Sequence, residues 1–151
     1  MVRQRSIFSF FLVLLATFLI SCGGPGVAIA PPTYTAVQLE KIQAYVPEIQ
    51  AVRDRSEELT TLIKQGDWIN VRNFIHGPIT EAKLNLTYVT PNLLPEDQPK
   101  ARQITRDFFK DLVKLDKATS AGNPLVALNQ SQAAFAEIDK FLDLLPKTEK
   151  S

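Results

Sequence analysis

Hydrophobic side chains recur every three or four positions through most of the chain after residue 36, which is the spacing of an amphipathic helix. The first such helix is expected at about residues 37–65, and Pro47 should kink it or mark its true beginning. Gly66 follows as a typical residue for ending a helix. Asp67 is then the expected N-cap of a second helix, which extends to about residue 89. The pattern predicts two helices joined by a tight turn.

The second predicted helix is interrupted at Gly77-Pro78. Pro78 has no N–H to donate to the carbonyl of Phe74, and its ring crowds the same carbonyl. The apolar side chain of Phe74 cannot replace the missing donor. We therefore expect a kink or local unwinding within one turn of Pro78.

Two further helices complete the pattern. The third is expected at about residues 96–120 and opens with two acidic residues, which suit the positive end of a helix dipole. The fourth has a complete start signal, because Gly122 ends the preceding helix, Asn123 is the N-cap and Pro124 follows it; Pro146 should stop this helix. No alternating apolar pattern is long enough to indicate a strand. The predicted fold is all-α, an antiparallel four-helix bundle.

The first 22 residues follow a different pattern. Arg3 and Arg5 precede an apolar run of 14 residues, 7–20, which is too short for a stable membrane span and typical of a secretory signal peptide. The run ends in a sequence that looks like the lipobox of bacterial lipoproteins, namely Leu19, Ile20, Ser21 and Cys22. In a lipobox the chain is cut before the cysteine, which carries the lipid.

An ordinary export signal cut after Ala30 is the alternative to the lipobox. Pro31 argues against it, because the fixed φ of proline fits poorly in the extended backbone that a peptidase holds. The lipobox places the protein outside the cytoplasm on a membrane surface. It predicts a removed signal peptide (1–21), a lipidated N-terminus with a flexible Gly/Pro-rich linker (22–35), the bundle (36–146) and a C-terminal tail (147–151).

Composition narrows the range of functions. The 151 residues have a formal net charge of +1, which argues against a nucleic-acid binder. One Cys and one His cannot form a closed zinc site, and the lipid would consume the Cys. The sequence has no phosphate-binding loop, haem-attachment motif, di-iron Glu-x-x-His pair or local nucleophile motif. We therefore expect no enzyme activity, no small-molecule substrate and no resident metal.

Two residues of the second helix leave alternatives open. His76 is expected to hydrogen-bond a carbonyl freed by Pro78; together with a carboxylate it could instead bind adventitious zinc. Trp68 is expected to be a core residue at the start of the helix, and a docking anchor is the alternative.

A basic stripe follows the third predicted helix at steps of three and four residues, opposite its apolar face: Arg102, Arg106, Lys110, Lys114 and Lys117. Asp107, Asp111 and Asp116 lie beside the stripe, and we expect the i,i+3 pairs Asp107–Lys110 and Asp111–Lys114 to neutralise part of it. The stripe is either an ordinary solvated face or a docking strip for an acidic protein surface or anionic lipid head groups.

The lipobox, the Pro-rich tether, the four helices and the stretch from Asp67 to Ile79 (DWINVRNFIHGPI) together resemble the PsbQ family in its cyanobacterial form, over about residues 31–146. The resemblance implies an up-down-up-down bundle that binds lumenal subunits of photosystem II without catalysing a reaction. It also implies that the protein stabilises the oxygen-evolving complex and supports its calcium and chloride requirement. Plant members have a long N-terminal region where this chain has a lipobox, so contacts of that region do not carry over.

The resemblance and the lipobox together predict a protein held by lipid on the lumenal side of the thylakoid membrane. The alternative is a generic envelope lipoprotein whose bundle binds a hydrophobic ligand or a partner protein.

Overall fold

A computed structural model describes residues 33–147, which form helices and turns and contain no strand. The N-terminal signal, Cys22 and most of the linker lie outside these residues. The elements are α2 (Ala36–Asp54), α3 (Ser56–Gln65), α4 (Trp68–Phe74), the π-helix η1 (Ile75–Ile79), α5 (Thr80–Val89), the 3-10 turn η2 (Thr90–Asn92), α6 (Gln98–Ser120) and α7 (Pro124–Leu142).

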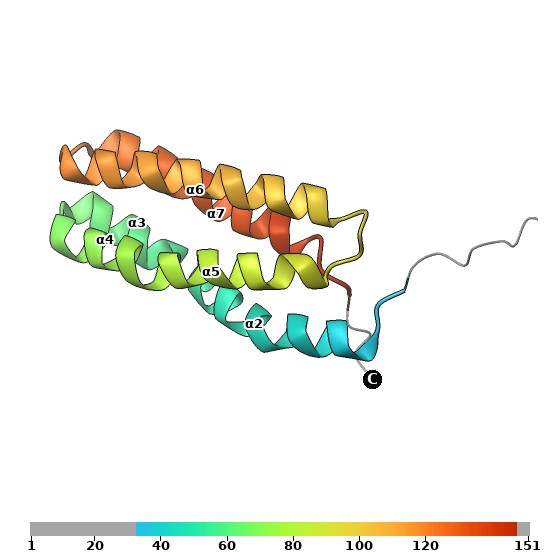
Figure 1. The fold of residues 1–151 in the computed structure, drawn as a ribbon. Helices are drawn as coiled ribbons and strands as arrows, with labels where there is room; N and C mark the ends of the chain where they lie inside the picture. Colours follow the sequence, from blue (N-terminus) through green and yellow to red (C-terminus); the bar gives the residue numbers. More distant parts are fainter. Residues whose placement is uncertain (1–32, 148–151) are drawn as a thin grey trace, which may run out of the picture. The chain divides into compact units, whose positions relative to one another are not determined.

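These elements build four long helices that pack side by side, as Figure 1 shows. The first comprises α2 and α3, the second runs through α4, η1 and α5, and α6 and α7 are the third and fourth. Side-chain contacts show that the second and third run antiparallel, because Lys83 lies over Phe109 while the earlier His76 reaches the later Asp116. The predicted four-helix bundle is confirmed.

Two turns at one end of the bundle have the same construction. Gly66 and Gly122 adopt left-handed φ values of 66° and 63°, which cost glycine little. The next residue of each turn donates its N–H back to the helix that has just ended, Asp67 to Leu62 and Asn123 to Ala118. The Asp67 and Asn123 side chains also accept the N–H groups of the residues three positions on, so both predicted N-caps are confirmed.

The first long helix differs from the prediction. Its start at Ala36 agrees, but Pro47 lies inside a continuous α2, and the helix is interrupted at Arg55 instead. Pro47 and the residue four positions earlier, Gln43, are both exposed, so water can bond the carbonyl that the proline leaves without a donor. At Arg55 the backbone has φ −90° and ψ 12°, outside the helical region, and its guanidinium lies 4.6 Å from the ring centre of Phe74.

At the opposite end of the bundle two helices are shorter than expected. α6 begins at Gln98, after the two acidic residues, and α7 ends at Leu142 rather than near Pro146. Leu144 and Leu145 continue as turns, bonded to the carbonyls three residues earlier. Residues that precede a proline disfavour the helical region, which explains why the helix ends before Pro146.

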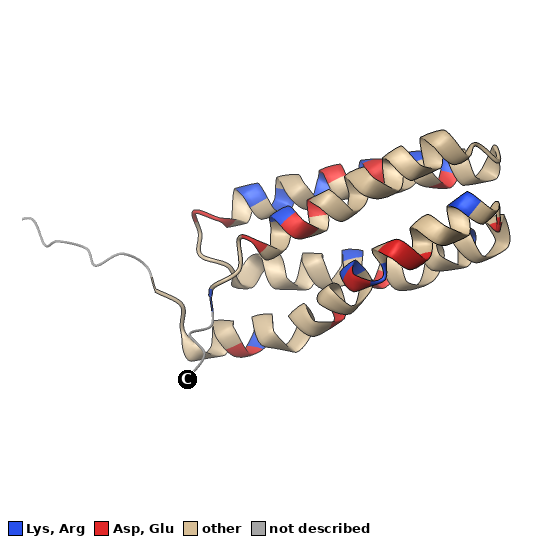
Figure 2. Ribbon diagram, turned by 180° about the vertical axis from the view of Figure 1, so that it is seen from behind, with Lys and Arg blue, Asp and Glu red and all other residues tan. Residues whose placement is uncertain are grey.

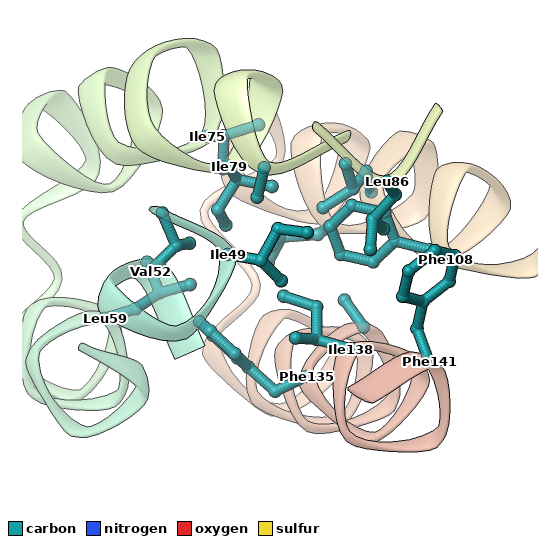
Figure 3. Packing of buried hydrophobic residues seen from close by; sticks show 14 of the residues in the cluster. Ile49, Val52, Leu59, Ile75, Ile79, Leu86, Phe108, Phe135, Ile138 and Phe141 are labelled. Atoms are coloured by element: carbon teal, nitrogen blue, oxygen red, sulfur yellow. The ribbon is translucent and has the colours of Figure 1, made fainter. Parts of the chain in front are cut away.

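The core runs along the whole bundle and draws on every long helix (Figure 3). Ile49, Leu59, Phe108, Ile138 and Phe141 are fully buried. Each such side chain contributes about 1.5–3 kcal/mol relative to its exposed state. The apolar faces predicted from the sequence therefore meet in one core, which leaves the opposite faces of the helices for contacts with other molecules.

Candidate docking surface

The predicted lipid site, Leu19 to Cys22, lies outside the described residues. The other predicted residues divide into three features: Trp68 at one end of the bundle, the Gly77-Pro78 segment, and the basic stripe on α6. Basic and acidic residues are interspersed along the helices, as Figure 2 shows. A docking surface therefore has to be found from the partners of individual charges rather than from their number.

Trp68 closes the end of the bundle where the two glycine turns lie. It is half-buried and packs against the core. A Cβ placed on Gly66 would lie 3.8 Å from the indole Nε1, and one on Gly122 would lie 3.7 Å from the same atom. Trp68 therefore packs beside both turns, which supports the predicted core role.

The Gly77-Pro78 segment forms the π-helix η1, so the predicted local unwinding is confirmed. The Thr80 hydroxyl donates a 2.9 Å hydrogen bond to the carbonyl of Ile75, five residues earlier. This bond reaches the carbonyl next to that of Phe74, to which Pro78 cannot donate. A Cβ on Gly77 would meet nothing within 4 Å, so the space around Gly77 does not require glycine.

We expected His76 to bond a backbone carbonyl freed by Pro78, but its partner in the structure is a side chain. Its Nε2 lies 3.1 Å from Asp116 Oδ1 on α6, and both side chains are partly exposed. The wider π turn is the segment that presents His76 toward α6. No group of three His, Cys, Asp or Glu side chains within residues 33–147 could hold a metal ion.

All five residues of the basic stripe are exposed on α6. The two predicted pairs are present: Lys110 Nζ lies 2.8 Å from Asp107, and Lys114 Nζ lies 2.9 Å from Asp111. The hydrogen bond from Lys110, followed by one from Gln103, lowers the pKa of the Asp107 carboxyl below its ordinary value. The middle of the stripe is therefore partly neutralised.

The beginning of the stripe differs from its middle. Within the described residues Arg102 and Arg106 form no ion pair and bond only the neutral side chains of Gln98 and Gln103, although the charge of Arg106 also helps to lower the pKa of Asp107. They line a pocket of about 320 Å³ between α6 and the end of the second helix; the other lining residues are Thr87, Thr90, Pro91 and Thr105. This pocket, which we call the arginine notch, joins two free guanidinium groups to a concave surface.

Apolar side chains beside the notch were missed in the sequence analysis. Phe109 and Val113, which follow the notch along α6, are 47% and 38% exposed; Leu84 and Tyr88 on α5 are also 47% and 49% exposed, but Tyr88 packs against Tyr45 of α2. Lys83 covers part of Phe109, with Nζ 3.9 Å from the ring centre. Phe109 directly follows the core residue Phe108, so the helical period already places it outside the buried face.

A second concave region lies between α2 and the end of α7. Its volume is about 570 Å³, and its lining mixes apolar residues such as Leu39 and Leu142 with Gln43, Gln50 and Lys147.

Among the described helices none is both long and apolar enough to cross a membrane.

Comparisons with known proteins agree with this architecture. The family model PsbQ, described as oxygen evolving enhancer protein 3, matches residues 2–146. The chain is 38% identical over 148 residues to "CyanoQ" of Synechocystis sp. (strain ATCC 27184 / PCC 6803 / Kazusa). The aligned residues cover 97% of this chain and 99% of that protein. The chain, which folds as an antiparallel four-helix bundle and is matched over almost its whole length, belongs to the PsbQ family in its cyanobacterial form.

Proposed function

We propose that the protein is a non-catalytic extrinsic subunit of photosystem II on the lumenal side of the thylakoid membrane. The observation that carries the proposal is the family match over residues 2–146, together with the similarity to CyanoQ over 97% of the chain. The described surface supports a binding role, because free cations and exposed apolar side chains lie together on α5 and α6.

We infer that the protein stabilises the oxygen-evolving complex and supports its calcium and chloride requirement. Photosystem II from a strain that lacks the protein should lose more oxygen evolution than wild-type photosystem II when either ion is withdrawn, and the full chain should restore it. An unchanged response to both ions would contradict this role.

A lipid on Cys22 is the proposed anchor, and the lipobox sequence of residues 19–22 supports it. More than one acyl chain holds a protein stably on a bilayer, whereas a single chain is marginal. Cys22→Ser should leave the precursor without lipid, so that a salt or alkaline wash releases the protein from membranes. Mass spectrometry that finds an unmodified native chain beginning at Pro31 would contradict the anchor.

We propose that the basic stripe on α6 orients the protein on its partner by complementary charge. One exposed ion pair contributes only about 0–1 kcal/mol, so a single substitution should have little effect. Reversal of Arg106, Lys110 and Lys114 to Glu together should weaken binding to depleted photosystem II and reduce its salt dependence. Identical retention and identical salt dependence would show that the stripe is a solvated face.

A further inference from the structure

We propose that the protein docks through one particular edge of α6, the edge that faces α5. The docking face consists of the arginine notch and the exposed residues Phe109 and Val113, which follow it along α6. The partner is a protein surface that presents a carboxylate beside an apolar patch. The proposal rests on the proposed function and narrows it to one contact surface and one partner chemistry.

The partners of the charges distinguish Arg102 and Arg106 from the middle of the stripe; Lys117, at its end, is exposed and forms no ion pair within the described residues. Lys110 and Lys114 are already paired with Asp107 and Asp111, whereas the guanidinium groups of Arg102 and Arg106 contact only glutamine oxygens. The pKa of Lys140 on α7 is raised first by Glu137 and further by Asp107 and Asp111. The Lys110–Lys114 edge therefore belongs to a network of paired charges shared with α7, and the arginine edge faces α5.

The chemistry of the notch favours a carboxylate. A guanidinium presents a planar set of donors that matches a carboxylate with two parallel hydrogen bonds. The threonine hydroxyls of Thr87, Thr90 and Thr105 are already donated to backbone carbonyls of their own helices. The donors left for an incoming group in the notch are therefore those of Arg102 and Arg106.

The apolar part of the face lies at a defined distance from the notch. Phe109 and Val113 follow Arg106 by three and seven residues, which places them about 5 Å and 10 Å further along the helix axis. Side chains such as these, next to arginines, are typical of the centre of protein interfaces. Beyond Val113 the face ends at the His76–Asp116 pair, which brings a carboxylate of its own.

This gradation argues for a protein rather than a lipid surface. The face changes from two arginines without an ion pair, through apolar side chains that Lys83 partly covers, to the His76–Asp116 pair with the exposed Lys117 beside it. A bilayer with anionic head groups attracts uniformly basic segments. A protein surface with a matching gradation would fix one orientation of the bundle, which is what charge complementarity provides.

The test compares two double variants that remove equal charge from the same helix. Arg102→Gln with Arg106→Gln removes the notch, and Lys110→Gln with Lys114→Gln is the matched control. The lipidated full chain is rebound to detergent-solubilised photosystem II depleted of it, and Kd is measured against sodium chloride concentration. We expect Kd to rise about tenfold and its salt dependence to fall for the arginine variant, against about twofold or less for the lysine variant.

Phe109→Ala tests the apolar part of the face, with Leu125→Ala as control, because Leu125 is 74% exposed at the other end of the bundle. Phe109→Ala should raise Kd about fivefold without changing the salt dependence, and Leu125→Ala should leave Kd unchanged. Equal thermal unfolding of the four variants and wild type ensures that changes in Kd report contacts rather than folding.

Four results would overturn the proposal. A larger effect of the lysine pair than of the arginine pair would place the contact on the α7 side and leave the proposed function intact. An equal loss of binding to phosphatidylglycerol vesicles in the arginine variant would make a membrane the occupant, and self-association that the same variant abolishes would make it a second copy. If the wild-type chain does not rebind photosystem II at all, both the proposed function and this inference fail.

Discussion

The α6–α7 hairpin and the hairpin made by α2 to α5 contribute to the same core, but only the former consists of uninterrupted helices. In α6 and α7 the prolines occupy the first turn, where the missing N–H has no intrahelical partner in any case. In the other hairpin Pro47 and Pro78 lie inside helices. A proline in the first turn therefore leaves a helix regular, and of the two interior prolines only Pro78 coincides with a change of helix type, because α2 continues through Pro47 and is interrupted at Arg55 instead.

The two interior prolines also differ from each other. Pro47 lies on an exposed face and α2 continues through it, whereas Pro78 is half-buried next to the buried Phe74 and the helix widens to a π turn. Water can bond the carbonyl that Pro47 leaves without a donor, while near Pro78 the Thr80 hydroxyl bonds the Ile75 carbonyl, which follows that of Phe74. The regular hairpin carries the basic stripe, and the irregular one presents His76 and Lys83 toward α6.

The largest effect is expected in the core of the regular hairpin. Phe135→Ala should lower the free energy of unfolding by about 3–5 kcal/mol and Ile138→Ala by about 2–5 kcal/mol, because both remove buried side chains of α7. Chemical denaturation measures both values. Lys147→Ala, beyond the end of α7, is the control and should change stability by about 0.5 kcal/mol or less. Equal midpoints for all three variants would contradict the packing register.

A smaller loss of stability is expected at the glycine turns, and it should be equal in the two hairpins. Gly66 ends α3 and Gly122 ends α6, both with left-handed φ values. Gly66→Ala and Gly122→Ala should each destabilise the protein by about 1–2 kcal/mol, because alanine pays for that conformation and glycine does not. Thermal unfolding of the two variants checks this. A cost several times larger at one turn would show that the two ends are not equivalent.

The π turn should lose more stability without the hydroxyl of Thr80 than regular α5 loses without the hydroxyl of Thr87. Thr80→Val keeps the shape but removes the hydroxyl that donates to Ile75, and should cost about 0.5–1.5 kcal/mol. Thr87→Val is the matched control, since its hydroxyl donates to the Lys83 carbonyl within regular α5. If both variants lose the same stability, the hydroxyl of Thr80 has no special role at the proline.

The smallest effect concerns two exposed carboxyls, one in each hairpin. Hydrogen bonds from Arg55 lower the pKa of Glu58, and one from Lys110 lowers the pKa of Asp107. Their contribution to stability is therefore present above the unfolded-state pKa values, about 4, and is lost as the pH falls through the folded-state values. Carboxyl NMR titration should show Lys110→Met raising only the pKa of Asp107 and Arg55→Met raising only that of Glu58. A variant that moves both values would link the two hairpins electrostatically.

The helices, their caps and the disruption at Pro78 could be predicted because each depends on a local signal. Gly66 with Asp67 and Gly122 with Asn123 are adjacent in the chain, so their roles follow from residue type. The interruption at Arg55 could not be predicted, since no proline or glycine marks it and its side chain is held by Phe74 from another helix. The continuity of α2 depended on whether Pro47 was exposed, which the sequence does not state.

Only part of the candidate docking surface could be predicted from the sequence. The stripe on α6 and its i,i+3 pairs follow from helical spacing alone. The notch with Thr87 and Pro91 depends on how the end of the second helix lies beside α6. The Asp116 partner of His76 is likewise 40 positions away in the chain.

The placement of Trp68 has a spectroscopic consequence. It is the chain's one tryptophan, and its indole lies beside both Gly66 and Gly122. An indole that leaves such a half-buried site for water shifts its fluorescence emission to longer wavelength. The intrinsic emission of the protein therefore reports whether the two turns stay closed around one ring, so that opening of this end during binding or unfolding can be followed without an added label.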